Sequence, residues 1–167
     1  GNVLVTKPAT PGHEGKPSVC LQGHLDMVCE KNADKKHDFS KDPIELVRKG
    51  NVLMANGTTL GADNGIAVAT NLALMEETTV AHGPLEFLFT VDEEKGLTGA
   101  KGLKPGFLTA SIMLNLDSEE DGALYVFRND GRKLMIENLI CGPTVEWWAN
   151  RSEIPLLPIR AGRDRGF

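Results

Sequence analysis

Short apolar segments that favour strands alternate, along the first 126 residues, with segments that favour helices. The strand-like segments are residues 2–6, 18–23, 51–54, 85–91, 111–116 and 123–127. In residues 85–91 every second side chain is apolar, and residues 66–77, rich in Ala, Leu and Met, predict a mostly buried helix, with a shorter one at 97–103. Strands that alternate with helices predict an α/β fold in which functional groups gather at strand ends.

Length and composition exclude several classes of protein. The chain has 167 residues and a formal net charge of -5, which fits one domain and disfavours nucleic acid as a partner. No apolar run is long enough to span a membrane, and the first residues form neither a basic leader nor a long apolar stretch. Cys20, Cys29 and Cys141 lack CxxC spacing, which argues against a disulfide framework and a thiolate zinc site. We therefore expect a cytoplasmic protein.

The composition changes near residue 127. Residues 1–126 contain ten Lys and one Arg, whereas residues 127–167 contain one Lys, six Arg and both Trp residues. Three prolines and several glycines interrupt any regular pattern in the second part. We predict a folded domain at residues 1–126, followed by an atypical Arg-rich tail at 127–167 that is weakly ordered.

Acidic residues and one histidine cluster at the ends of the predicted strands and before the predicted helix. These residues are His24, Asp26, Asp63, Glu93, Glu94 and Asp117. Carboxylates gathered in a partly buried crevice repel one another, and they are driven towards protonation unless a cation keeps them ionised. A histidine with several carboxylates and no thiolate suits zinc, manganese or cobalt at a catalytic site.

The spacing of these residues suggests a division of roles. In the adjacent pair Glu93–Glu94, one carboxylate can bind metal while its neighbour moves protons on the bound water. The single residue between His24 and Asp26 allows Asp26 to orient the imidazole without binding the metal itself.

Each of these patterns also has a simpler interpretation. His24 and Asp26 could form a surface or capping pair, the string Asp63-Asn64-Gly65 could be a turn that caps a helix, and residues 92–95 could be a solvated loop. Residues 117–122 resemble a calcium loop, but Arg128 stands where an EF-hand needs Glu. The sequence contains no GxSxG, P-loop or GxGxxG string, so the commonest motifs of serine hydrolases, phosphate-binding proteins and dinucleotide-binding proteins are absent.

Taken in order, several strings resemble the aminoacyl-histidine dipeptidases, also called Xaa-His or cytosol nonspecific dipeptidases, of the cocatalytic di-zinc peptidase superfamily. The strings are residues 22–28, 37–39, 42–44, 57–65, 84–86, 90–94, 96–100 and 115–120. Residues 57–65 and 117–120 point to the dipeptidase branch. The resemblance covers residues 1 to about 126. It implies a partial zinc-peptidase-type catalytic domain, the N-terminal half, with a mixed sheet flanked by helices.

The resemblance also implies a role for each candidate residue. His24 and Asp117 would hold one zinc ion, Glu94 would help to hold a second, and Asp63 would bridge the two ions. Manganese and cobalt are the alternative metals. Asp26 would orient His24, and Glu93 would be the general base for a metal-bridging water. The implied substrates are small dipeptides, including those with a C-terminal His.

The sequence departs from the family pattern in its second part. The family has a distant C-terminal His and an inserted lid that forms the homodimer contact, and this sequence contains neither. Residues 127–131 read Phe-Arg-Asn-Asp-Gly where the family has Gly-Cys-Ala-Gly-Gly. We therefore expect a truncated, frameshifted or recombined reading frame and poor activity of this chain. The alternatives are a non-catalytic metal-binding fragment or binding module, and an aminoacylase or carboxypeptidase of the same superfamily.

Overall fold

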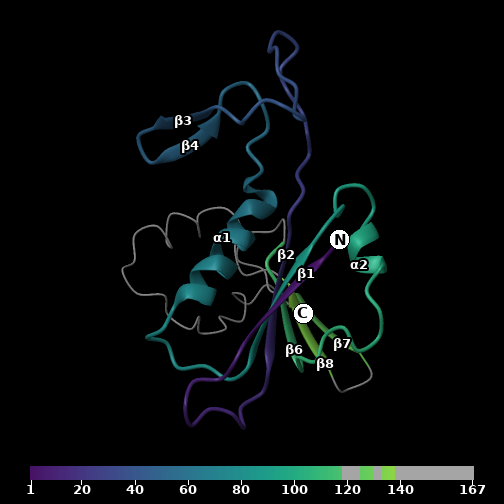
Figure 1. Cartoon of the computed structure of the whole chain (residues 1–167). Helices are drawn as coiled ribbons and strands as arrows, with labels where there is room; N and C mark the ends of the chain where they lie inside the picture. Colours follow the sequence, from purple (N-terminus) through teal and green to yellow (C-terminus); the bar gives the residue numbers. More distant parts are fainter. Residues whose placement is uncertain (118–124, 130–132, 138–167) are drawn as a thin grey trace, which may run out of the picture.

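A six-stranded mixed sheet forms the centre of the computed structural model, which describes residues 1–117, 125–129 and 133–137 (Figure 1). Its strands are β1 (Val3–Lys7), β2 (Val19–His24), β5 (Leu85–Thr90), β6 (Ile112–Asn115), β7 (Tyr125–Asn129) and β8 (Lys133–Glu137). They lie in the order β1-β5-β2-β6-β8-β7. The predicted α/β class with a mixed sheet and helices is confirmed.

The direction of the central strands brings the candidate residues to one edge of the sheet. β2 is parallel to both β5 and β6, with His24 opposite Thr90 and Gln22 opposite Asn115. β1 is antiparallel to β5, and β7 is antiparallel to β8. Because parallel strands end at the same edge, the segments that follow β2, β5 and β6 lie next to one another.

Both faces of the central strands are buried. On one face, the helix α1 (Ala62–Glu76) packs on a core of Leu21, Ala67, Phe87, Phe89 and Leu116. On the other face, Cys20, Leu88 and Ala110 form a second core, to which the segment after the short helix α2 (Thr98–Lys101) contributes Leu103 and Leu108. The predicted alternation in residues 85–91 therefore directs Phe87 and Phe89 towards α1.

The helix α1 differs from its prediction in two ways. Asp63 and Asn64 have non-helical φ and ψ angles, so the regular helix runs from Gly65 rather than Ile66. The helix is also less buried than predicted, since Leu72 is 50% exposed while Asn64, Ala67 and Asn71 are buried. Its buried residues recur every three or four positions, which is the spacing of a helix with one face on a sheet.

A two-stranded hairpin lies away from the main sheet (Figure 1). It consists of β3 (Leu46–Lys49) and β4 (Val52–Ala55), of which only the second was predicted. Gly50, at the first position of the two-residue turn, has φ of 60°, a conformation that glycine adopts without steric cost.

Part of the predicted tail belongs to the sheet. β7 crosses the predicted boundary at 126/127, and β8 lies beyond it, parallel to β6. The prediction of weak order for the rest of the tail falls on residues 138–167, which lie outside the described residues. Within the described ranges, no helix combines the length and apolar character needed to cross a membrane.

Candidate metal centre

His24 lies at the centre of the candidate residues. It ends β2, and its side chain is only 1% exposed. Its Nε2 atom lies 3.0 Å from Oδ1 of Asp63, 3.6 Å from Oδ2 of Asp117 and 3.9 Å from Oε2 of Glu93. The start of α1 and the segments after β5 and β6 therefore each bring a carboxylate to the same imidazole nitrogen.

The side chains form two overlapping groups that could hold a metal ion. One group is His24, Asp63 and Glu94, and the other is His24, Glu93 and Asp117; within each group the ligand atoms lie within 4.8 Å of one another. Both members of the pair Glu93–Glu94 therefore lie within reach of a metal. Among the described residues, His13, His37 and His82 belong to neither group.

Asp26 contacts His24 mainly through its backbone. Nδ1 of His24 lies 2.8 Å from the backbone oxygen of Asp26 and 3.5 Å from the Asp26 carboxylate. A carbonyl oxygen only accepts hydrogen bonds, so Nδ1 carries the proton in the neutral ring and Nε2 offers its lone pair to a metal. The Asp26 carboxylate instead accepts hydrogen bonds from the backbone N–H groups of Glu93 and Glu94, at 3.0 and 3.1 Å.

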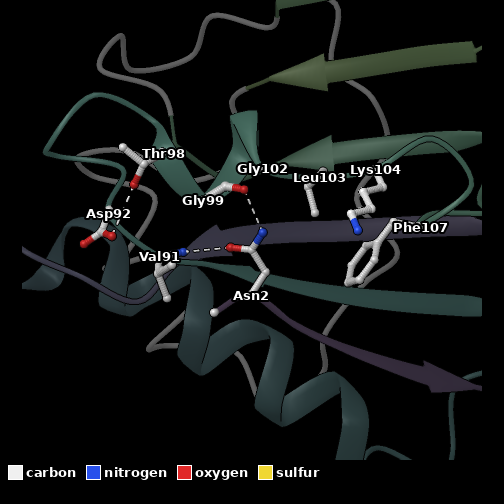
Figure 2. A pocket seen from close by; sticks show the side chains of 10 residues that line it. Asn2, Val91, Asp92, Thr98, Gly99, Gly102, Leu103, Lys104 and Phe107 are labelled. Atoms are coloured by element: carbon white, nitrogen blue, oxygen red, sulfur yellow. Dashed lines mark hydrogen bonds between the residues drawn. The ribbon is translucent and has the colours of Figure 1, made fainter.

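The loop that carries Glu93 and Glu94 is also held at both ends by Asn2 (Figure 2). The Asn2 amide donates to the backbone oxygen of Gly99 at 2.7 Å and accepts from the backbone N–H of Val91 at 3.2 Å. Inside the loop, Asp92 and Leu97 have φ of 53° and 61°, which costs a non-glycine residue of order 1–3 kcal/mol. Together with the Asp26 contacts, these bonds fix an otherwise strained loop beside His24.

A cavity of about 500 Å³ lies beside α2 and is lined in part by this loop (Figure 2). Asn2, Val91, Thr98, Leu103 and Phe107 are among its lining residues. None of the six candidate residues lines this cavity, so it is separate from the carboxylate cluster.

Asn64 is a site neighbour that the sequence did not reveal. Its Nδ2 atom donates to the backbone oxygen of Leu116 at 2.9 Å and to Oδ1 of Asp117 at 3.0 Å. In the sequence, Asn64 stands between Asp63 and Gly65, where asparagine is typical of a turn. No signal in the sequence distinguishes a turn asparagine from one that contacts a residue in a distant segment.

The ionisation of the cluster favours a cation. Burial raises the pKa of Asp117 to about 6, and the neighbouring carboxylates of Asp63 and Glu93 add to this rise while His24 opposes it. Burial, followed by Asp63 and Glu93, also raises the pKa of Glu94. For His24, burial acts to lower the pKa, but Asp117, the Asp26 carbonyl and Asp63 together raise it. A divalent cation would relieve the repulsion among these carboxylates.

The fold and this arrangement of residues agree with comparisons to known proteins. The model of peptidase family M20/M25/M40 matches residues 20–149. The chain belongs to this family. The match begins at the second residue of β2 and covers every segment that contributes to the carboxylate cluster.

Individual relatives are similar over about three quarters of this chain. The chain is 53% identical over 126 residues to the cytosol non-specific dipeptidase of Escherichia coli, covering 75% of this chain and 26% of that protein. It is 53% identical to the crystal structure of aminoacylhistidine dipeptidase from Vibrio alginolyticus, with a TM-score of 0.71 over 74% of this chain and 25% of that one. For aminopeptidase PepT from Bacillus cereus the identity is 31% and the TM-score 0.58, over 74% of this chain and 31% of that one.

These comparisons confirm the resemblance that the sequence motifs predicted. This chain spans about a quarter of the length of the two dipeptidases that it matches.

Proposed function

We propose that this chain contributes a metal centre for the hydrolysis of dipeptides, including those with a C-terminal His. The observation that carries the proposal is the position of the His24 Nε2 atom, which faces carboxylates from three other segments of the chain. The identity of 53% to two dipeptidases, against 31% to aminopeptidase PepT, supports dipeptides as the substrate class. The name of the Escherichia coli relative supports a cytoplasmic location.

The donor atoms fit zinc, with manganese and cobalt as alternative metals. One imidazole and several carboxylates, without a thiolate in either group, are the ligands of catalytic rather than structural zinc sites. We propose that His24 and Asp117 hold one ion, that Asp63 is shared, and that Glu94 contributes to the second. When bound, zinc supplies a Lewis acid that polarises the peptide carbonyl and lowers the pKa of water.

We assign proton transfer to Glu93. Its side chain is 30% exposed, its Oε2 atom lies 3.9 Å from Nε2 of His24, and its backbone N–H donates a hydrogen bond to Asp26. In this role it would accept a proton from the attacking water and donate it to the leaving amine. The family resemblance supports this assignment, and the position of Glu93 beside His24 and Asp117 is compatible with it.

Metal binding and hydrolysis can be measured separately on this chain. We expect zinc to bind, and dipeptides with a C-terminal His to be hydrolysed slowly, with the hydrolysis lost on adding a chelator. Glu93→Gln should lower the hydrolysis rate by about 10²- to 10⁴-fold, whereas Glu76→Gln, at an exposed position in α1, should leave it unchanged. Zinc binding without any hydrolysis would favour the alternative of a non-catalytic metal-binding module. Absence of zinc binding would contradict both functions.

A further inference from the structure

Asn64 lies at the point where three metal-ligating segments meet. It is 3% exposed and follows Asp63 directly in the chain. Its two amide hydrogens are both used, one by the backbone oxygen of Leu116 at 2.9 Å and one by Oδ1 of Asp117 at 3.0 Å. The side chain therefore joins the start of α1 to the end of β6.

The bond to Asp117 determines which oxygen of that carboxylate faces His24. Oδ1 of Asp117 is held by the Asn64 amide, whereas Oδ2 lies 3.6 Å from Nε2 of His24. The amide N–H occupies one lone pair of Oδ1, which makes that oxygen the poorer electron donor to a metal ion. Oδ2, which faces His24, would therefore be the preferred oxygen of Asp117 for an ion held together with His24.

Asn64 also lies against the segment that carries His24. A Cβ atom added at Gly23 would lie 2.5 Å from Oδ1 of Asn64, so only a glycine allows this approach. Gly23 immediately precedes His24 in β2. The position of Asn64 is therefore fixed from two sides, by β2 and by the end of β6.

We propose that Asn64 is a positioning residue of the metal centre, which orients Asp117 so that its Oδ2 atom faces the ion site beside His24. The inference rests on the proposed metal-dependent function. It assigns no contact between Asn64 and the metal or the substrate. Asn64 acts through the orientation of Asp117 and through the spacing of Asp63 and His24.

Asn71 provides a matched comparison within the same helix. It lies two turns further along the buried face of α1 and is 0% exposed. Neither its Oδ1 nor its Nδ2 atom has a hydrogen-bond partner in the part of the chain that the structure describes. Burial of an asparagine in α1 is thus separable from the contact with Asp117.

The test compares Asn64→Leu with Asn71→Leu, since leucine branches at the same atom as asparagine and has no hydrogen-bond donors. Cobalt(II) is titrated into each metal-free chain, and its visible absorption reports both affinity and coordination. We expect Asn64→Leu to weaken cobalt binding by about 10- to 100-fold, the usual effect of losing a partner of a metal ligand, and to change the absorption spectrum. Asn71→Leu should bind cobalt as the native chain does, with the native spectrum.

Circular dichroism and thermal unfolding of the metal-free chains provide the folding control. If Asn64→Leu does not fold, Asn64→Ala removes the same two donors with a smaller side chain and carries the same test. Native affinity and spectrum in the folded variant would overturn the inference, as would equal losses in the Asn64 and Asn71 variants. Failure of the native chain to bind cobalt would overturn the proposed metal centre and this inference with it.

Discussion

The carboxylate of Asp26 accepts a hydrogen bond from the backbone N–H of Glu93 at 3.0 Å, although 67 residues separate the two in the chain. Its other oxygen accepts from the N–H of Glu94 at 3.1 Å, and its backbone oxygen lies 2.8 Å from Nδ1 of His24. One residue thus connects the imidazole to the acidic pair. A proposed metal ligand and the proposed base are thus fixed relative to each other through Asp26.

Replacing Asp26 by asparagine should weaken metal binding. The Asn amide would present its NH₂ group to one of the two backbone N–H donors, so one of the two hydrogen bonds would be lost. We expect zinc affinity to fall by roughly 10-fold or more, as for other residues that orient metal ligands. Competition with a chromophoric chelator measures this change. Asp34→Asn, at an exposed position in the loop after β2, is the matched control, and equal affinities for the two variants would contradict the prediction.

The native chain and Asp26→Asn should also differ in how their stability responds to acid. Burial acts to raise the pKa of Asp26, but the hydrogen bonds from the N–H groups of Glu93 and Glu94 outweigh burial. The pKa of Asp26 in the folded chain is therefore below the unfolded value of about 3.9. The ionised carboxylate therefore stabilises the fold above about pH 4, and this contribution is lost as the pH falls through the lower folded pKa. In urea unfolding of metal-free chains, the difference between native and Asp26→Asn should be largest above pH 4 and shrink below it. A difference that is constant with pH would contradict the linkage.

Gly23 should be a stability determinant because α1 lies so close to β2. A Cβ atom at this position would lie 2.5 Å from Oδ1 of Asn64 and 2.7 Å from Cβ of Ala67. Gly23→Ala should therefore lower the free energy of unfolding by about 1–3 kcal/mol, the usual cost of overpacking. In Gly65→Ala, nothing lies within 4 Å of the added atom, so this variant should not lower the free energy of unfolding. Urea unfolding that gave equal changes for both variants would show that α1 can move away from β2.

The sequence predicted the features that depend on local pattern. Apolar runs defined β2, β5 and β6, and acidic residues at their ends, where parallel strands finish, were enough to predict the convergence around His24. Because the three strands are parallel and end at one edge of the sheet, residues that are far apart in the sequence lie close together there.

The remaining features depend on contacts between distant segments. β3 includes Arg48 and Lys49 and has no clear alternation, so it becomes a strand only through its pairing with β4. β8 was likewise missed, because its place in the sheet comes from its pairing with β6 and β7. The contact of the Asp26 carboxylate with the backbone of Glu93 was missed for a similar reason, because backbone partners leave no trace in the residue types.

The two adjacent glutamates should respond differently to substitution. Glu94 lies in the group with His24 and Asp63, so Glu94→Ala would remove a proposed ligand and leave Asp63 as the main carboxylate of the proposed second site. We expect the occupancy of that site to collapse. Glu93→Gln keeps the shape of the side chain and should leave the zinc content nearly unchanged, while it removes proton transfer, an effect on rate of about 10²- to 10⁴-fold.

Zinc content and hydrolysis rate together separate the two roles. Glu93 also lies within ligand distance of His24 and Asp117, so geometry alone would allow it to bind an ion. Loss of a metal ligand lowers the metal content, and the hydrolysis rate falls as a consequence. Loss of the general base lowers the hydrolysis rate while the metal content stays the same. If Glu93→Gln and Glu94→Ala lose zinc equally, both residues are ligands and the proton acceptor lies elsewhere. If neither loses zinc, residues 92–95 form a solvated loop, and only His24, Asp63 and Asp117 remain as candidate ligands.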